Sequence, residues 1–419
     1  MLRYHIWTIG CQMNKAESER MGSYLEKQGY KATPDVREAD FIVLNSCVVR
    51  AGAENKVVNK LHTLKELKKL RPDLVLALTG CLASSDVDRL KETFPQVDYF
   101  FSPGDCPPWI ENNTGSVHTV LPEHPSPSTF VPIMQGCDNF CSYCIVPYRR
   151  GRERSRPPGE IIDEVKQLAR CGVKEVTLLG QNVDSYGHDL ADRPDLAGLL
   201  GGLNEVEGLV RIRFLTSHPK DMSPGLIAAV ARLDKVCEHI SLPVQAGSND
   251  ILGAMRRGYT VEYFRELISR IRSQVAGVAL STDIIVGFPG ESRGLFERTV
   301  ALLTELRFDT VHMAAYSPRP GTMASRELED NVPPAEKVER RRRVEELQEG
   351  ITGEINACLL GEVVEVLVEA SNKGKWQGRT RSGKLVFFTS SRNCFGQLVM
   401  VEIERTSPWS LQGVIAASR

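Results

Sequence analysis

The sequence lacks several features that would each assign it to a broad class of proteins. No segment approaches the ~18 consecutive apolar residues that a membrane-spanning helix needs. Net charge is also nearly absent, since 52 Lys and Arg against 53 Asp and Glu leave a formal charge of -1. A globally basic nucleic-acid-binding protein is therefore excluded, and any polyanion must meet a local basic patch. Internal repeats and low-complexity tracts are missing as well, and the 42% hydrophobic residues predict that most of the chain folds.

The N-terminal segment lacks the uninterrupted apolar core of a signal peptide, because Arg3, His5 and Thr8 interrupt it. A secreted disulfide framework is equally unsupported. The eleven cysteines are an odd number spread over a long chain, which favours reduced thiols or metal ligands. We therefore expect a cytoplasmic protein that binds no membrane. Its 419 residues suffice for several domains.

The first third of the sequence alternates between strand and helix patterns. Apolar runs that predict strands occupy residues 3–9, 40–46, 73–79 and 97–101. Stretches long enough for helices, such as residues 16–28 and 53–70, separate them and favour a parallel sheet. Residues 103–128 are rich in Pro, Asn, Ser and His without periodicity, which predicts a linker.

The alternation resumes in the middle of the sequence. Six runs predict strands at residues 130–134, 175–180, 210–216, 238–244, 279–286 and 309–316. Six parallel strands with helices between them suggest a partial barrel, in which reactive groups follow the C-terminal ends of the strands.

The last part of the sequence changes character. A charged helix is expected over residues 335–349, and its four arginines, 340–343, are interpreted as a solvated face, with nucleic-acid binding as the alternative. From about Gly353, short β-rich runs predict a small antiparallel barrel. The expected fold class is α/β, with an N-terminal parallel α/β sheet, a central partial (β/α)6 barrel and a C-terminal antiparallel β-barrel.

Three cysteines follow the first predicted barrel strand within the segment QGCDNFCSYC. Cys137, Cys141 and Cys144 have C-x3-C-x2-C spacing. Three thiolates in one turn can hold three irons of a 4Fe-4S cluster and leave the fourth iron open, whereas structural zinc prefers four ligands. The alternative is a zinc knuckle completed by a distant His or Cys.

Three further cysteines each follow one of the first three predicted strands, in the contexts TIGC, LNSC and LTGC. Parallel strands present their C-terminal ends along one edge, so Cys11, Cys47 and Cys81 should converge into a second three-thiolate site. Gly10 and Gly80 would let the backbone turn tightly beside them. The alternative is three buried, inert thiols.

The remaining cysteines share no such geometry and are expected to be inert: Cys106, Cys171, Cys237, Cys358 and Cys394. No two of the eight histidines form a metal-ligand pair at helical spacing, and His218 is a candidate site residue only because it follows a strand.

The C-x3-C-x2-C spacing with an aromatic residue before the last cysteine resembles the radical S-adenosylmethionine (SAM) superfamily. The segments CDNFCSYCIVPYRRGRERSRP, GCQMNKAESERM, NSCVVRAGAENKV and GCLA resemble the methylthiotransferases, and LLGQNVDSYG, LPVQAGSNDIL and MRRGYT are similar to the tRNA-modifying MiaB type. The resemblance spans essentially the whole chain. Two departures, Ala246 in place of a typical serine and GCLASSD in place of GCMAQ, remove no cysteine.

This resemblance implies three domains. Residues 1–120 would hold an auxiliary 4Fe-4S cluster on Cys11, Cys47 and Cys81. Residues 121–350 would form the radical SAM core, with a second 4Fe-4S cluster on the other three cysteines. Residues 351–419 would be a TRAM domain that binds RNA. The implied cofactors are two 4Fe-4S clusters and SAM.

The implied reaction is methylthiolation at C2 of N6-isopentenyladenosine, adjacent to the anticodon of tRNA. An aromatic C–H has no accessible pKa, so a radical is needed. An open iron that chelates the amino and carboxylate groups of SAM can deliver the electron that splits SAM into methionine and a 5′-deoxyadenosyl radical. The second cluster would present the sulfur that joins the base.

Polar residues at the barrel strand ends, and one aromatic residue in the cysteine loop, are candidates for SAM contacts. They are Tyr143, Gln181, Asn182, Ser217, Gln245 and Asp283. For each, the alternative is an ordinary capping or barrel-lining residue.

Two basic segments are candidates for RNA contacts. The arginines of RRGRERSR (Arg150, Arg152 and Arg154) follow the cysteine loop, and the alternative for them is an ion-paired loop. The segment KGKWQGRTRSGK combines basic residues with one aromatic residue, which suits a single-stranded loop, and the alternative is a solvated hairpin. Its candidates are Lys373, Lys375, Trp376, Arg379 and Arg381.

The leading hypothesis is therefore an enzyme whose partners are tRNA and an electron donor of the flavodoxin or ferredoxin type, acting as a monomer. Two alternatives lie within the superfamily: methylthiolation of another tRNA adenosine, of the threonylcarbamoyl type, or of a ribosomal-protein aspartate. A non-enzymatic iron-sulfur RNA-binding sensor is the alternative from another class, and failure to cleave SAM would favour it.

Overall fold

The computed structural model describes residues 1–48, 51–84, 87–103, 105–110, 121–122 and 125–416. The chain forms two compact units. Unit 1 comprises residues 1–125, 135–138 and 144–153, and unit 2 comprises residues 126–134, 139–143 and 154–419. Much of the predicted linker 103–128 lies outside the described residues, as do Ser85 and Asp86 of GCLASSD. The domain boundaries drawn after residues 120 and 350 stay predictions.

Unit 1 is built on a parallel sheet whose strand order is β2-β1-β3-β4-β5. Four of these strands confirm the sequence prediction: β1 (Arg3–Thr8), β3 (Phe41–Ser46), β4 (Val75–Gly80) and β5 (Tyr99–Phe100). The edge strand β2 (Lys31–Ala32) was missed, because two residues are too few to show a hydrophobic period.

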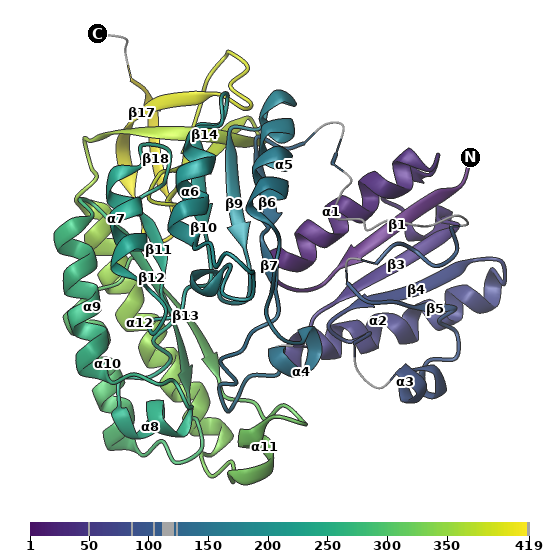
Figure 1. Cartoon of the computed structure of the whole chain (residues 1–419), viewed down its shortest axis with the longest axis horizontal. Helices are drawn as coiled ribbons and strands as arrows, with labels where there is room; N and C mark the ends of the chain where they lie inside the picture. Colours follow the sequence, from purple (N-terminus) through teal and green to yellow (C-terminus); the bar gives the residue numbers. More distant parts are fainter. Residues whose placement is uncertain (49–50, 85–86, 104, 111–120, 123–124, 417–419) are drawn as a thin grey trace. The chain divides into compact units, whose positions relative to one another are not determined.

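Helices cover both faces of this sheet (Figure 1). Ile42, Leu44, Leu76 and Leu78 of the central strands pack with α2 (Ala51–Leu70). Their neighbours in sequence point to the other face, where α1 (Gln12–Lys27) packs on Val43. Since both faces are buried, the central strands read as continuous apolar runs. Three short helical elements also lie in the described part of this unit: the 3-10 turn Val36–Glu38, α3 (Val87–Thr93) and α4 (Val146–Arg150).

Unit 2 contains the six parallel strands predicted for the partial barrel. They form two sheets, β10-β9-β6 and β11-β12-β13. A bridge between Ile212 and Val236 and a hydrogen bond from the Ser217 amide to the Ser241 carbonyl connect the two sheets. The strand bounds are β6 (Ser128–Pro132), β9 (Glu175–Leu179), β10 (Arg211–Phe214), β11 (His239–Ser241), β12 (Ala279–Val286) and β13 (Thr310–Ala315). All six strands confirm the prediction.

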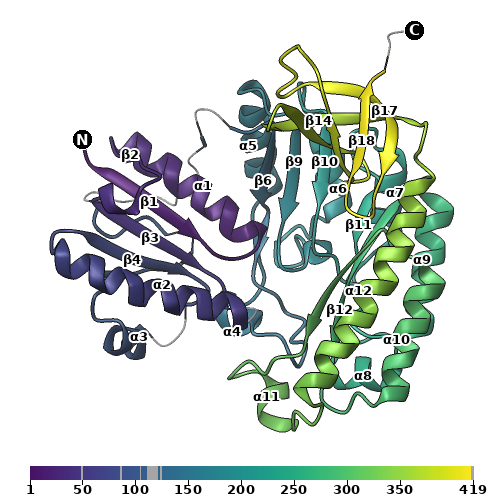
Figure 2. The ribbon, with the colours of Figure 1, turned by 180° about the vertical axis from the view of Figure 1, so that it is seen from behind.

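Amphipathic helices alternate with these strands and lie outside them (Figure 2). The long ones are α5 (Pro158–Arg170), α6 (Leu196–Asn204), α7 (Pro224–Arg232), α9 (Val261–Gln274), α10 (Arg293–Leu306) and α12 (Pro334–Ala357). Shorter elements lie in the loops: β7 (Met134–Gln135), β8 (Arg154–Ser155), the 3-10 turn Val183–Ser185, α8 (Asn249–Ala254) and α11 (Met323–Glu327). Within the described residues, no helix combines the length and apolarity needed to cross a bilayer.

The C-terminal part of unit 2 is a closed barrel in the order β14-β15-β16-β18-β17. Its strands are β14 (Val363–Asn372), β15 (Lys375–Thr380), β16 (Leu385–Phe388), β17 (Leu398–Thr406) and β18 (Leu411–Ile415). The barrel is antiparallel as predicted, except that β16 and β18 pair in parallel. Five strands that alternate in direction cannot close a ring, so one neighbouring pair has to be parallel.

Buried arginines attach this C-terminal barrel to the N-terminal ends of the central strands. Arg211 begins β10, and its guanidinium donates to the Glu365 carboxylate at 2.8 Å and to the Arg379 carbonyl at 2.8 Å. Arg213 donates to the carbonyls of Thr380 and Arg381, each at 2.6 Å. The C-terminal barrel therefore occupies the end of the central barrel opposite to the C-terminal strand ends.

The structure corrects the interpretation of the arginine run 340–343 as a solvated face. The side chain of Arg340 is 4% exposed and pairs with Glu291, which is 1% exposed, at 2.6 Å. Arg343 pairs with Glu297 at 2.6 Å and lies over the Phe296 ring. Only Arg341 and Arg342 are well exposed. The helix also continues past residue 349, because Ile351, Thr352 and Asn356 extend its buried face.

Two neighbouring substitutions in this run should differ in stability. Arg340→Ala leaves Glu291 buried without its cation, so we expect unfolding to become easier by about 3–5 kcal/mol. Arg341→Ala removes an exposed pair with Glu345 and should cost about 0.5 kcal/mol or less. Denaturant unfolding of both variants measures the difference, and equal losses would contradict it.

Candidate functional site

The C-terminal edge of the unit 1 sheet gathers the three cysteines that the sequence placed after its strands. Cys47 directly follows β3 and Cys81 directly follows β4. The Cys81 amide donates to the Ser46 carbonyl at 2.8 Å, which fixes the two cysteine backbones side by side. Cys11 caps α1, and its thiol donates to Asn14 Oδ1 at 3.2 Å.

The two glycines beside these cysteines, where the sequence predicted tight turns, leave no room for a side chain. A Cβ on Gly80, whose φ is +89°, would lie 2.3 Å from the Ser46 carbonyl oxygen. A Cβ on Gly10 would lie 2.8 Å from Cys47 Cβ and 2.3 Å from Asn14 Oδ1. The close approach that excludes these side chains is what brings the loop after β1 next to the loop after β3.

A buried ion pair lies against this cysteine group. Arg150 of α4 donates from Nε to Cys81 Sγ at 3.3 Å and from Nη1 to Glu17 Oε1 at 2.7 Å. The Arg150 and Glu17 side chains are 3% and 4% exposed. A hydrogen bond from Cys47, together with the charge of Arg150, lowers the pKa of Cys81 to about 6, although burial opposes this. Cys81 is therefore poised as a thiolate, the form that binds metals.

These three thiols fit an iron-sulfur cluster in donor type and in number. Three cysteine sulfurs are gathered on one sheet edge, and one of them has a thiolate-favouring environment. In the part of the chain that the structure describes, no three Cys, His, Asp or Glu side chains already stand at metal-binding spacing. Cys11 would have to turn from Asn14 toward the other two sulfurs.

The loop that carries the other three cysteines is fixed at both ends. Within unit 1, the Cys137 amide donates to the Gly151 carbonyl at 3.2 Å. Within unit 2, the Ser142 amide donates to the Met255 carbonyl at 3.0 Å, and the Ser142 carbonyl accepts from the Ala324 amide. Cys137 and Cys141 are buried, and Cys144 is partly exposed.

A second buried arginine contacts this loop. Arg257 donates from Nη1 to Cys141 Sγ at 3.3 Å and from Nη2 to the Pro243 carbonyl at 2.8 Å. Sequence reasoning quoted Arg257 only as part of MRRGYT and missed its position. No local rule links residue 257 to residue 141, because the contact depends on the barrel bringing them together.

Four candidate SAM residues follow the C-terminal ends of barrel strands, as predicted: Gln181, Asn182, Ser217 and Gln245. Asp283 lies within β12, and Tyr143 lies in the cysteine loop. Ser217 donates to Asp184 Oδ1 at 2.8 Å, and the Gln245 amide donates to the Asp283 carbonyl at 2.8 Å. Asn182 donates to Asp221 at 2.8 Å. Gln181 is partly exposed beside Asn182, and the Tyr143 ring meets the edge of Phe288 with centroids 6.5 Å apart.

Three side chains at these strand ends carry buried polar atoms without a hydrogen-bond partner: Asn182 Oδ1, His218 Nε2 and Gln245 Oε1. Thr216 and Gln245 also have positive φ angles of 73° and 75°. Unpaired buried polar atoms and left-handed backbone both cost free energy, and both are common at binding sites. Such a cradle fits a polar ligand such as SAM.

Asp184 joins this group although sequence reasoning did not single it out from LLGQNVDSYG. Burial raises the pKa of Asp184 to about 7, against hydrogen bonds from Ser217 and the His218 amide that favour its ionised form. Burial, with help from Arg257 and Lys220, lowers the pKa of His218 to about 2. Burial therefore favours the neutral form of both the Asp184 carboxyl and the His218 imidazole.

The candidate RNA residues divide into exposed and internally paired ones. Arg150 as an RNA contact is corrected, because its buried side chain pairs with Glu17. Arg152 and Arg154 are exposed, and Arg152 lies 3.1 Å from Asp138.

The C-terminal hairpin is divided in the same way. Lys373, Lys375 and Arg379 are exposed, and Trp376 is half-buried with its indole N–H on the Ser390 carbonyl. Arg381 donates to both carboxylate oxygens of Glu238, at 2.9 and 2.7 Å, so it fastens the barrel instead of facing solvent.

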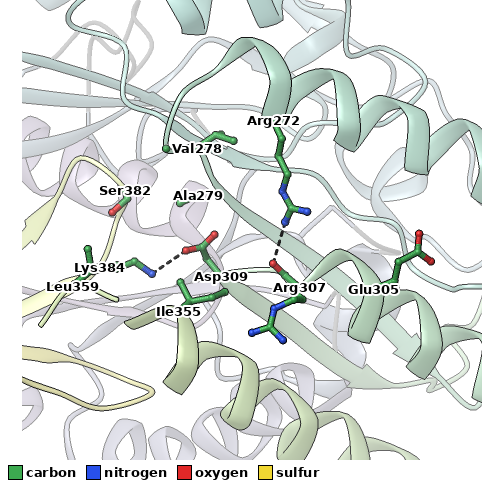
Figure 3. Close-up of a pocket in the computed structure, with 11 residues that line it drawn as sticks. Arg272, Val278, Ala279, Glu305, Arg307, Asp309, Ile355, Leu359, Ser382 and Lys384 are labelled. Carbon is green, nitrogen blue, oxygen red and sulfur yellow. Dashed lines mark hydrogen bonds and ion pairs between the residues drawn. The ribbon is translucent and has the colours of Figure 1, made fainter. Parts of the chain in front are cut away.

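A cavity of about 460 Å³ lies at the N-terminal ends of β12 and β13 (Figure 3). Its charged lining is already paired: Lys384 contacts Asp309 at 2.8 Å, and Arg272 donates to the Leu306 and Arg307 carbonyls. Because it lies at the end opposite to the strand ends that carry the orphaned polar atoms, this cavity is separate from the candidate site.

Three family models match the chain. The uncharacterized protein family UPF0004 matches residues 3–102, the radical SAM superfamily matches residues 131–303, and the TRAM domain matches residues 359–416.

Curated relatives match nearly the full length. A Dehalococcoides mccartyi (strain CBDB1) protein named tRNA-2-methylthio-N(6)-dimethylallyladenosine synthase is 53% identical over 98% of this chain and 97% of the relative. Proteins of the same name from Chloroflexus aurantiacus and Moorella thermoacetica are 49% and 46% identical over 98% of this chain, covering 91% and 97% of themselves.

Solved structures share the fold at low identity. The radical SAM methyltransferase TsrM from Kitasatospora setae aligns with a TM-score of 0.54 at 14% identity, covering 78% of this chain and 74% of TsrM. The cobalamin-dependent SAM radical enzyme OxsB aligns with a TM-score of 0.51 at 11% identity, covering 83% and 56%.

The pH dependence of stability should report the buried pair Asp184 and His218. The folded-state pKa of Asp184 is raised to about 7. Its favourable contribution to the unfolding free energy is therefore complete near pH 4 and is lost as pH rises toward 7. The unfolding free energy of Asp184→Asn minus that of the parent should therefore rise by up to about 1.4 kcal/mol per pH unit over that window.

His218→Gln provides the matched comparison. Because the pKa of His218 is lowered in the folded state, its contribution to the unfolding free energy is complete above about pH 6.5 and is lost as pH falls. The unfolding free energy of His218→Gln minus that of the parent should therefore fall as pH rises, opposite to the Asp184→Asn difference. Unfolding curves across pH 4.5–7 decide it, and a flat difference for Asp184→Asn would show that the carboxyl is ionised throughout.

Proposed function

The chain belongs to the tRNA-2-methylthio-N(6)-dimethylallyladenosine synthase family, and from that membership we propose that it methylthiolates C2 of N6-isopentenyladenosine adjacent to the anticodon in tRNA. The observation that carries this proposal is 53% identity to a synthase of that name across 98% of the chain. As a radical SAM enzyme it uses SAM and a 4Fe-4S cluster.

We assign one 4Fe-4S cluster to each cysteine group. Cys137, Cys141 and Cys144 would hold the cluster that binds SAM, and Cys11, Cys47 and Cys81 would hold the auxiliary one. The C-x3-C-x2-C loop and the convergence of three cysteines at one sheet edge support the assignment. Bound clusters and SAM supply the radical and the sulfur that an aromatic C–H without an acidic proton requires.

The residues at the strand ends would bind and orient SAM. Asn182, Ser217 and Gln245 offer polar groups, of which Asn182 and Gln245 carry unpaired oxygens. Tyr143 would face the adenine ring, and Gln181 and Asp283 would complete the polar lining. The Asn182 side chain is held by Asp221 and the Ser217 side chain by Asp184, so the ligand would meet two groups that are already positioned.

The exposed basic residues would hold the RNA. Lys373, Lys375 and Arg379 lie on one hairpin with Trp376, which suits a single-stranded loop, and Arg152 and Arg154 follow the cysteine loop. Residues 1–120, 121–350 and 351–419 would thus serve as the auxiliary-cluster, radical and RNA-binding parts. We further propose a cytoplasmic monomer that receives electrons from a flavodoxin or ferredoxin.

Measurements of iron content and of product formation should distinguish the roles of the two cysteine groups. Anaerobically reconstituted protein should carry about eight irons, and replacing either cysteine triad by Ala should leave about half. The Cys11/Cys47/Cys81 variant should still cleave SAM to 5′-deoxyadenosine, yet add no methylthio group, because radical generation needs only the other triad.

Mass spectrometry of tRNA nucleosides, from a deletion strain complemented with each variant, reads substrate and product together. Loss of all iron in either folded triple variant would refute independent sites. A missing 2-methylthio group on a base other than isopentenyladenosine in the deletion strain would identify a different tRNA substrate, and unchanged tRNA would favour the ribosomal-protein aspartate.

Salt dependence should locate the RNA clamp. Replacing Lys373, Lys375 and Arg379 by Ala should weaken tRNA binding and flatten the slope of log affinity against log salt by about 0.7–0.9 per lost phosphate contact. SAM cleavage without RNA should not change. Filter binding over a salt series measures the slope, with Arg392→Ala on the same barrel as the control; an unaltered slope would show that this hairpin is not the clamp.

A further inference from the structure

Each cysteine group is contacted by one buried arginine. Arg150 donates to Cys81 Sγ and Arg257 donates to Cys141 Sγ, both at 3.3 Å. The residues themselves are 8% and 5% exposed. Each contact lies inside a single compact unit, Arg150 in unit 1 and Arg257 in unit 2.

The two arginines differ in whether their charge is balanced. Glu17 offsets Arg150, with a guanidinium-to-carboxylate distance of 2.7 Å and both side chains at most 4% exposed. Arg257 otherwise donates to two neutral oxygens, the Tyr259 hydroxyl at 3.0 Å and the Pro243 carbonyl at 2.8 Å. Among the described residues, no carboxylate lies within ion-pair distance of Arg257. One group therefore has a net positive charge beside its sulfur, and the other has a neutral pair.

This difference in charge balance affects how readily each cluster would accept an electron. Adding an electron to a cluster increases its negative charge, and a cation or an N–H donor at a ligand sulfur favours the reduced form. The effect is large where water is excluded, because charges interact more strongly at low dielectric. An unbalanced arginine therefore raises the reduction potential of the cluster it touches more than a balanced one does.

We propose that Arg257 and the Arg150–Glu17 pair set the reduction potentials of the two clusters apart, so that an incoming electron favours the Cys137/Cys141/Cys144 cluster. The inference rests on the proposed function, since it takes both cysteine groups as cluster ligands. Arg257 and Arg150 are positioning residues here, because they act through the cysteine sulfurs.

The test measures each cluster alone in the full-length, reconstituted protein. In the background with Cys11, Cys47 and Cys81 replaced by Ala, redox titration followed by EPR gives the potential of the remaining cluster. Arg257→Met should lower the equilibrium constant for its reduction at least tenfold, which is about 59 mV for one electron. Arg257→Lys keeps the charge and should recover most of the loss. Arg256→Met, which changes the exposed neighbour, should have no effect.

The complementary background replaces Cys137, Cys141 and Cys144 by Ala. Here Glu17→Gln leaves Arg150 unbalanced and should raise the equilibrium constant for reduction of the auxiliary cluster at least tenfold. This arm stands even if Arg257→Met does not fold. Unchanged potentials in clusters of normal iron content would overturn the inference. Failure of either folded background to hold iron would instead refute the assignment of independent clusters, the part of the proposed function on which this inference rests.

Discussion

The alignment of parallel strands is the constraint on which the rest of this protein depends. Because the C-terminal ends of β1, β3 and β4 meet at one edge, residues 11, 47 and 81 come together without any local spacing. The same rule places Asn182, Ser217 and Gln245 at the ends of three successive barrel strands. Strands that are buried in both units hold the loops beyond them in place, so those loops can carry strained backbone and unpaired polar atoms at a tolerable cost.

Some of the charge lies inside the molecule. The near-equal counts of acidic and basic residues do not describe a uniform mixed surface, since Arg150, Arg211 and Arg340 are buried and ion-paired. Burying a charge is expensive unless a partner and hydrogen bonds replace its water, and each of these arginines has both. The buried Arg257 differs from these three arginines, since its partners are neutral oxygens and a sulfur. That difference gives it an electrostatic influence that the paired arginines lack.

The two ends of one hairpin in the C-terminal barrel have different environments. Backbone carbonyls at its inner end accept hydrogen bonds from Arg211 and Arg213, and Arg381 forms an ion pair with Glu238. This end is therefore bound to the central barrel. The outer end of the hairpin, with Lys373 and Lys375, stays exposed. A segment that is basic throughout in the sequence is thereby divided into a half that is bound to the central barrel and a half that is exposed.

The sequence by itself determined the order of strands and helices along the chain, and it predicted both cysteine groups and the two glycine turns, because hydrophobic period and strand-end placement are local properties that parallel topology converts into contacts. The order of the strands within each sheet came only from the tertiary structure. It also predicted the partial barrel and the small C-terminal barrel. Only the tertiary structure decided which arginines are buried, that Arg150 pairs with Glu17, and that Arg257 reaches Cys141. Those contacts join residues 133 and 116 positions apart. A single arginine carries no local signal of its partner, because burial and pairing are set by how separate elements pack.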